Sequence, residues 1–277
     1  MADAYRNLSD YAFSTWTLDT RPLKDALEAI ARNGFTTVEL WGDSVHFDPR
    51  AGQDLKLVHK WLSDLNLTVH SVHGPFRNYE NPPEDEAEFR RLRMALCKRA
   101  VENVSEIGAP IMVVHAVDRQ EYNYRRDQTQ IVGDFLAELC AYARPLGVQI
   151  ALENIFPGLQ TDDEITCTLQ NQIKLFPGIG LKYCLDIGHA TLGKVDLHQE
   201  ALAAGSDLVT LHIHNNDGSS DSHNLPNDGI IDWNELYGFL RGMGYEGQFV
   251  LEILGGDDPE DTVRRTRALF DGGIRAT

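Results

Sequence analysis

The sequence predicts a closed (β/α)₈ barrel, built as one domain over residues 1–277. Eight short runs rich in Val, Ile, Leu and aromatic residues recur along the chain. Longer segments with apolar residues at helical spacing lie between most of them, and no linker or low-complexity tract interrupts the alternation. An open doubly wound sheet is the alternative fold. It is less favoured because the Gly-rich motif that such sheets carry after their first strand is absent.

The predicted strands and helices follow one another in order. The eight strands cover residues 11–18, 36–41, 68–76, 111–117, 148–155, 181–189, 208–214 and 249–254. The helical segments cover residues 22–34, 53–66, 85–108, 131–147, 233–244 and 259–273. In the first helix, Leu23, Leu27 and Ile30 share one face, and Gly34 follows the last turn, as helix C-termini prefer. The connection between the fifth and sixth strands has the least regular pattern.

Composition and charge narrow the function classes. The formal net charge of −17 opposes binding to polyanions, so nucleic acid is not an expected partner. No apolar run approaches the roughly 20 residues that span a bilayer, and the first residues lack the pattern of a secretion signal. The four cysteines form no C-x-x-C pair. We therefore expect a cytoplasmic protein with no membrane partner, and a homo-oligomer is compatible with the sequence.

Polar side chains end six of the eight predicted strands. They are His73, His115, Glu153, Asp186 with His189, His212 with His214, and Glu252. In such a barrel the carboxyl ends of the strands meet at one mouth, where active sites form. Small or medium-sized residues stand two positions earlier, and strand alternation predicts that they fill the barrel interior. These are Ser71, Val113, Ala151, Cys184, Thr210 and Val250.

Each of these polar side chains has a structural explanation when taken alone. A lone histidine is more often a hydrogen-bonded core residue than a ligand. Glu153 and Glu252 can form buried ion pairs, and Asp186 can cap a helix. However, few Lys or Arg residues stand near the strand ends, and the polar residues all occupy the same end of their strands. Carboxylates and imidazoles that converge without cations imply a bound metal ion.

Residues outside this set have ordinary explanations. His70 has the opposite strand parity to His73, so we expect it to face the surrounding helices. For His214 we expect a hydrogen bond within the loop, with contact to a substrate as the alternative. Trp16 and Trp41 end the first two strands, where they either pack in the core or form an apolar wall beside a ligand.

Eight motifs in chain order resemble those of the xylose isomerase-like TIM-barrel superfamily. They are GFTTVELW, VHGPF, VVHA, ALEN, LDIGHA, LHIHNNDG, DSHNLPNDGIIDW and VLEIL. This superfamily holds sugar and sugar phosphate isomerases and epimerases together with the related endonuclease IV-type DNA repair enzymes. The resemblance spans nearly the whole chain, and it implies a TIM barrel.

The resemblance also implies three sets of metal ligands. In isomerase and epimerase members, one divalent metal is held at the ends of strands five to eight, and the matching residues are Glu153, Asp186, His212 and Glu252. Endonuclease-like members hold two further metals. The ligands of one of these metals are matched by His73 and His115, together with Glu153, which is shared with the first metal. The ligands of the other are matched by His189, Asp221 and His223. The implied ion is Mn²⁺, Mg²⁺, Co²⁺ or Zn²⁺.

Two departures from the family patterns bear on the reaction. Ketohexose 3-epimerases place an arginine shortly after the strand-seven histidine, but residues 213–222 contain none. The nuclease pattern favours an aspartate where Asn215 stands. The candidates for a basic surface that could hold a DNA duplex are few: Arg77, Arg119, Arg125 and Arg126.

We expect a metal-dependent isomerase or epimerase that acts on a sugar or sugar phosphate through an enediolate. Glu153 and Glu252 would form the acid/base pair, and His189 would assist at a substrate oxygen. Three alternatives remain. One is an endonuclease IV-like multi-zinc phosphodiesterase that acts on abasic-site DNA. The others are a dehydratase or lyase of a keto-sugar or keto-inositol, and a sugar-binding barrel without catalytic activity.

Overall fold

Eight parallel strands close into a barrel in the order β1 to β8, with each strand paired to the next and β8 paired to β1. The computed structural model describes residues 4–5, 7–43, 45–75, 85–116, 128–158 and 167–271. The strands are β1 (Tyr11–Ser14), β2 (Thr37–Trp41), β3 (Thr68–His73), β4 (Ile111–His115), β5 (Gln149–Glu153), β6 (Lys182–Asp186), β7 (Leu208–Ile213) and β8 (Phe249–Leu251). Each lies within one predicted strand, and the predicted (β/α)₈ barrel is confirmed.

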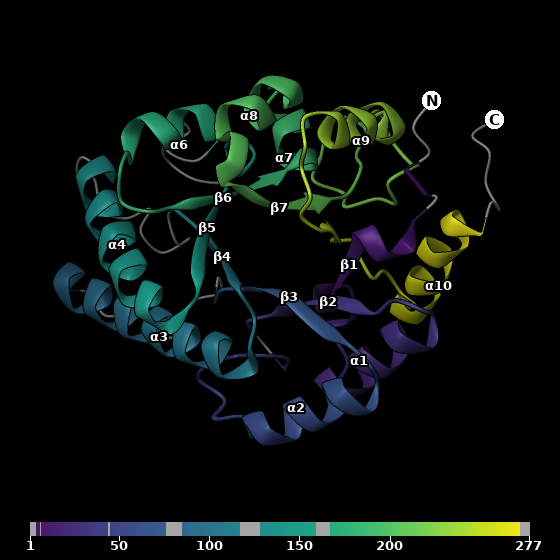
Figure 1. Ribbon diagram of the computed structural model, residues 1–277, viewed down its shortest axis with the longest axis horizontal. Helices are drawn as coiled ribbons and strands as arrows, with labels where there is room; N and C mark the ends of the chain where they lie inside the picture. The colour runs from purple at the N-terminus through teal and green to yellow at the C-terminus, as the bar shows by residue number, and fades with distance from the viewer. Residues whose placement is uncertain are drawn as a thin grey trace.

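Helices surround the barrel (Figure 1). They are α1 (Leu23–Arg32), α2 (Leu55–Asp64), α3 (Glu86–Ile107), α4 (Gln128–Ala143), α6 (Leu169–Leu175), α7 (Ile187–Leu192), α8 (Leu197–Ala204), α9 (Trp233–Gly242) and α10 (Pro259–Phe270). In α1, Leu23, Leu27 and Ile30 are buried, as their spacing predicts. Within the described part of the chain, no helix has both the length and the apolarity that a membrane span requires.

The predicted sixth strand, residues 181–189, is shorter in the structure. β6 stops at Asp186, and α7 starts directly at Ile187. The reason is local, because the Asp186 carboxylate accepts a hydrogen bond from the backbone N–H of His189 at 2.7 Å and so caps the helix. His189 therefore stands on the first turn of a short helix at the barrel mouth. Neither α7 nor α8 was among the predicted helices.

A β-bulge in β3 changes which way its side chains point. Val38 pairs with Val69 but Glu39 pairs with Ser71, so His70 is an extra residue in the ladder. Its Nε2 lies 3.2 Å from Oγ1 of Thr210, on the opposite side of the barrel. The prediction that His70 faces the helices is wrong, because parity counting assumes an unbroken ladder.

The barrel interior is filled by small side chains beneath the mouth. Val113, Ala151 and Cys184 pack together with Ile111 in a buried cluster, and Ser71 is fully buried as well. Thr210 and Val250 are also fully buried, so all six positions predicted to fill the interior are buried. Above these small side chains, the polar side chains of the strand ends face one another at the mouth of the barrel.

Candidate metal centre

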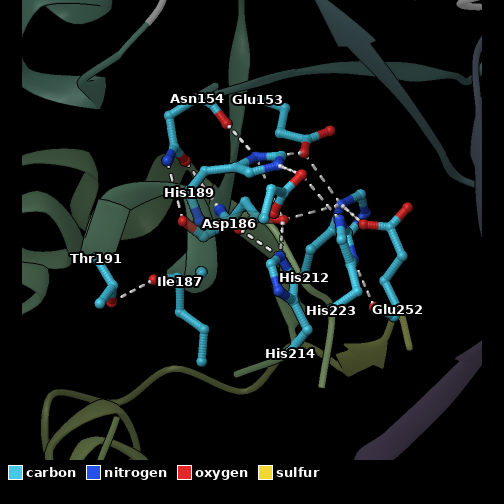
Figure 2. A network of polar contacts seen from close by, with 12 residues as sticks. Glu153, Asn154, Asp186, Ile187, His189, Thr191, His212, His214, His223 and Glu252 are labelled. Atoms are coloured by element: carbon cyan, nitrogen blue, oxygen red, sulfur yellow. Dashed lines mark hydrogen bonds and ion pairs between the residues drawn. The ribbon is translucent and has the colours of Figure 1, made fainter. Parts of the chain in front are cut away.

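Four candidate ligands from consecutive strands converge at the mouth of the barrel. His212 Nδ1 lies 3.3 Å from Glu153 Oε1, 3.3 Å from Glu252 Oε2 and 4.0 Å from Asp186 Oδ2. One ligand atom of each residue lies within 4.8 Å of those of the other three, and all four residues are buried. Figure 2 shows the three carboxylates around the His212 ring. We call these four residues the central group.

The central group fits a divalent metal ion. Two ligands of one tetrahedral ion, each bound at about 2.0–2.2 Å, lie roughly 3.3–3.6 Å apart, which is the spacing around His212 Nδ1. That nitrogen is buried and makes no hydrogen bond within the described residues. In the same part of the chain, Glu153, Asp186 and Glu252 form ion pairs with histidines and with no Lys or Arg. The donors are those that Mn²⁺, Mg²⁺, Co²⁺ and Zn²⁺ accept in proteins.

Asp186 is fixed from several sides. Its Oδ1 accepts the helix-capping bond from His189 and lies 3.0 Å from His214 Nε2. The Asn154 side chain binds the backbone of Asp186 twice, accepting from its N–H at 2.8 Å and donating to its carbonyl at 3.0 Å. These contacts fix the carboxylate so that Oδ2, which also lies 3.1 Å from His214 Nε2, faces His212 Nδ1 at 4.0 Å.

A second group lies beside the first and shares Glu153 with it. Glu153 Oε2 lies 3.1 Å from His115 Nε2 and 3.4 Å from His73 Nε2, while Oε1 faces His212. His73, His115 and Glu153 are close enough to hold one ion, and we call them the β3–β4 group. The Trp41 ring lies 4.7 Å from the His73 ring, so this tryptophan forms an apolar wall beside the group.

A third group, which we call the outer group, consists of His189, His214, Asp221 and His223. Asp221 Oδ2 lies 3.3 Å from His223 Nε2 and 3.4 Å from His189 Nε2. The rings of His189 and His223 approach to 5.9 Å between centroids. His214 stacks on His223 at 3.7 Å, so it belongs to this group and the expected hydrogen bond within the loop is wrong.

Asn215 builds the loop that carries Asp221 and His223. Its buried side chain makes four hydrogen bonds to loop backbone: it donates to the carbonyls of Pro226 and Ile231, and it accepts from the N–H groups of Asn216 and Ile231. An amide can both donate and accept at this position, whereas an ionised carboxylate only accepts and would face the two carbonyl oxygens. The asparagine therefore stabilises the loop through contacts that an aspartate would lose, which accounts for one departure from the nuclease pattern.

Charge pairing dominates the ionisation of these buried groups. Burial acts to raise the pKa of Glu252, but the charge of His212 lowers it to about 2. Burial acts to lower the pKa of His189, but the charge of Asp186 and the hydrogen bond to Asp221 hold it well above its ordinary value. Glu252 is therefore ionised at neutral pH, and the pKa values of His189, His212 and His223 are all raised, so these imidazoles hold their protons more tightly than a free imidazole does. An ion that binds here must displace those protons, which makes its affinity depend on pH.

Sequence reasoning missed one carboxylate of the site. Glu39 on β2 is fully buried, and its Oε2 lies 3.3 Å from His212 Nε2. The signal was present in the motif GFTTVELW, since an acidic residue within an apolar strand is the feature that singled out Glu153 and Glu252. The four arginines considered for a basic surface, Arg77, Arg119, Arg125 and Arg126, lie outside the described residues.

The closed barrel, with carboxylates and imidazoles gathered at the carboxyl ends of its strands, identifies this chain as a TIM-barrel protein with a candidate metal centre. The chain belongs to the xylose isomerase-like TIM-barrel family, whose pattern matches residues 27–271. An uncharacterized protein of Methanocaldococcus jannaschii is 27% identical over 255 residues, which cover 86% of this chain and 85% of the relative. Fructoselysine 3-epimerase of Shigella flexneri is 24% identical over 243 residues, with 84% and 86% coverage.

Solved structures agree on the fold. A D-tagatose 3-epimerase-like protein superposes with a TM-score of 0.77 at 20% identity, over 95% of this chain and 97% of the other. At this identity the likeness shows a shared barrel and leaves the reaction to be argued from the site.

Proposed function

We propose that the protein is a divalent-metal-dependent isomerase or epimerase of a sugar or sugar phosphate, acting through an enediolate. One observation carries the proposal: Glu153, Asp186, His212 and Glu252 converge from four consecutive strands around one point. The epimerases among the relatives and structural neighbours support it. We further propose a cytoplasmic location, because the four cysteines are buried and unpaired, as in a reducing compartment.

The proposed mechanism uses two carboxylates on different sides of the site. A divalent ion bound here would act as a Lewis acid on the substrate oxygens and so make the C–H bond next to the substrate carbonyl more acidic. Glu153 and Glu252 approach from β5 and β8, and we assign them as the proton-transfer pair. One removes the carbon-bound proton to give the enediolate. The other returns a proton to the opposite face for an epimerisation, or the proton returns at the neighbouring carbon for an isomerisation.

We assign His189 to a substrate oxygen. Its Nδ1 donates a hydrogen bond to the Asn154 carbonyl at 3.0 Å, and its Nε2 faces Asp221 at 3.4 Å. The backbone of α7 and the Asn154 carbonyl thus fix the ring, and its raised pKa keeps a proton available at neutral pH. His189 can donate that proton to an oxygen that becomes negatively charged during the reaction.

The second candidate is an endonuclease IV-like phosphodiesterase. The observation in its favour is that the β3–β4 group and the outer group flank the central group, so that several metal-competent groups lie side by side at the mouth. The net charge of −17 opposes a DNA substrate. A dehydratase or lyase of a keto-sugar or keto-inositol uses the same proton removal, followed by loss of a leaving group from the adjacent carbon.

Glu252→Gln tests the assignment, because glutamine keeps the volume but cannot accept the proton. We expect the variant to fold, to retain metal less tightly, and to lose exchange of substrate C–H with deuterated solvent by about 10²- to 10⁴-fold. The substrate panel contains ketoses, aldoses, their phosphates and keto-inositols, beside an abasic-site DNA duplex. Glu246→Gln is the matched control, since Glu246 is exposed and precedes β8 at the other end of the strand.

The outcomes separate the functions. Exchange with a sugar and no cleavage of the duplex supports the isomerase or epimerase. Exchange followed by loss of a substituent identifies a lyase. Metal-dependent cleavage of the duplex without exchange on any sugar overturns the proposal in favour of the phosphodiesterase.

A further inference from the structure

Glu39 lies directly beneath the central group. It stands on β2 with its side chain fully buried in the barrel interior. Its Oε2 accepts a hydrogen bond from Ser71 Oγ at 2.7 Å and lies 3.3 Å from His212 Nε2. The His212 ring therefore lies between carboxylates on both sides, with Glu39 at Nε2 and Glu153 and Glu252 at Nδ1.

Core packing alone does not account for this carboxylate. A buried charge is costly unless it is paired and hydrogen bonded. Glu39 Oε1 makes no hydrogen bond within the described residues, and Ser71 supplies only one neutral donor to Oε2. The bulge at His70 is what brings Ser71 opposite Glu39, so the strand is distorted at the point where this pairing forms.

The flanking histidines are held differently. His73, His189 and His223 each donate from Nδ1 to a backbone carbonyl, at 2.9, 3.0 and 2.8 Å, and turn Nε2 toward a carboxylate of the site. His212 instead turns Nδ1 toward the site and places Nε2 against a side-chain carboxylate. Both ring nitrogens therefore face carboxylate oxygens, which accept and cannot donate. An ion held between Nδ1 and the carboxylates of Glu153 and Glu252 would take the Nδ1 lone pair, which leaves the ring proton on Nε2 with Glu39 as its acceptor.

We propose that Glu39 is a positioning residue that fixes His212 in the Nε2–H tautomer and so presents the Nδ1 lone pair to a metal ion in the central group. This inference rests on the metal site of the proposed function. A carboxylate behind a ligating imidazole orients the ring and makes its free nitrogen a stronger donor. On the side away from the site, the histidine of the central group has a side-chain carboxylate as its partner, whereas His73, His189 and His223 have backbone carbonyls there.

The test measures Zn²⁺ binding to the full-length protein after chelator treatment, using a competing chromophoric chelator. Glu39→Gln removes the charge and allows the amide to donate to Nε2, so we expect the central Zn²⁺ to bind about 10- to 100-fold more weakly. The variant should still fold without metal, because glutamine keeps the volume of the side chain and can still accept the hydrogen bond from Ser71. If Glu39→Gln fails to fold, Glu39→Asp replaces it, since the shorter side chain keeps the charge but withdraws it from Nε2.

Glu200→Gln is the matched control. Glu200 is also buried, but it accepts from the backbone N–H groups of Leu169 and Gln170 at the start of α6 and belongs to none of the three groups. We expect this control to lose stability and to keep the wild-type affinity for Zn²⁺. A second readout is the ¹⁵N spectrum of ring-labelled histidine in the Zn²⁺-loaded wild type, where His212 should be coordinated through Nδ1 and protonated at Nε2.

The outcomes separate this inference from the proposed function. Wild-type affinity in Glu39→Gln, or coordination of His212 through Nε2, overturns the role of Glu39 and leaves the central metal site standing. A wild-type protein that binds no divalent ion overturns both.

Discussion

The central group and the outer group lie side by side at the barrel mouth, but the chain positions them by different means. The central residues end or directly follow β5 to β8, so the hydrogen-bond register of the barrel sets their positions. The outer residues sit on α7, just after β7, and in the loop that Asn215 holds together. The comparison teaches that the central group depends on the fold of the whole barrel, whereas the outer group depends on a few local hydrogen bonds.

The largest effect is expected from Glu153→Gln. Glu153 contacts His212 through Oε1 and His73 and His115 through Oε2, so its loss should remove metal from both the central and the β3–β4 groups. The outer group does not contain Glu153 and should keep its capacity. We expect activity to fall by about 10²- to 10⁴-fold. Element-specific metal stoichiometry checks this, and a variant that also loses outer binding would show that the groups are not separable.

A smaller effect is expected from Asn215→Asp, which should weaken the outer group and leave the central group intact. The carboxylate would face the carbonyls of Pro226 and Ile231 in a buried position, at a cost of about 1–3 kcal/mol in the free energy of unfolding. Outer metal binding should weaken while the central ion is retained. Urea unfolding and metal titration measure the two effects.

Asn234→Asp is the control for this substitution. Asn234 is exposed, and the oxygen of its side chain accepts from the N–H of Ala4, a role that aspartate keeps. Equal loss of the central and outer ions in Asn215→Asp would contradict the division into two regions.

The smallest effect at neutral pH is expected from His70→Gln beneath the central group. Burial lowers the pKa of His70 to about 4, while the unfolded chain takes up a proton near pH 6.5. The free energy of unfolding therefore decreases as pH falls from about 6.5 to 4, because only the unfolded state binds that proton. Glutamine should remove this part of the acid sensitivity. Unfolding midpoints at pH 7 and 4.5 measure it, and an unchanged difference between them would show that His70 is not held neutral.

Strand alternation alone predicted the barrel and the convergence of the strand-end residues, because residues at the carboxyl ends of parallel strands must meet. It failed at His70, where a bulge breaks the alternation. It also missed that His189 stands on a helix, since capping by Asp186 ends β6 earlier than the apolar run suggests. His214 could not be assigned because its position depends on a three-dimensional loop whose bonds run through Asn215.

The central claim is that Glu153, Asp186, His212 and Glu252 hold one divalent metal ion. Anomalous diffraction at the absorption edges of Mn, Co and Zn, from crystals of protein purified without chelator, tests it most directly. Mg²⁺ has no usable edge, so crystals without such a peak are soaked in Mn²⁺ and measured again. The account predicts a peak within about 2.0–2.4 Å of His212 Nδ1 and of one oxygen from each carboxylate. A peak only at the outer or β3–β4 group, or no peak at the central position after Mn²⁺ soaking, would contradict it.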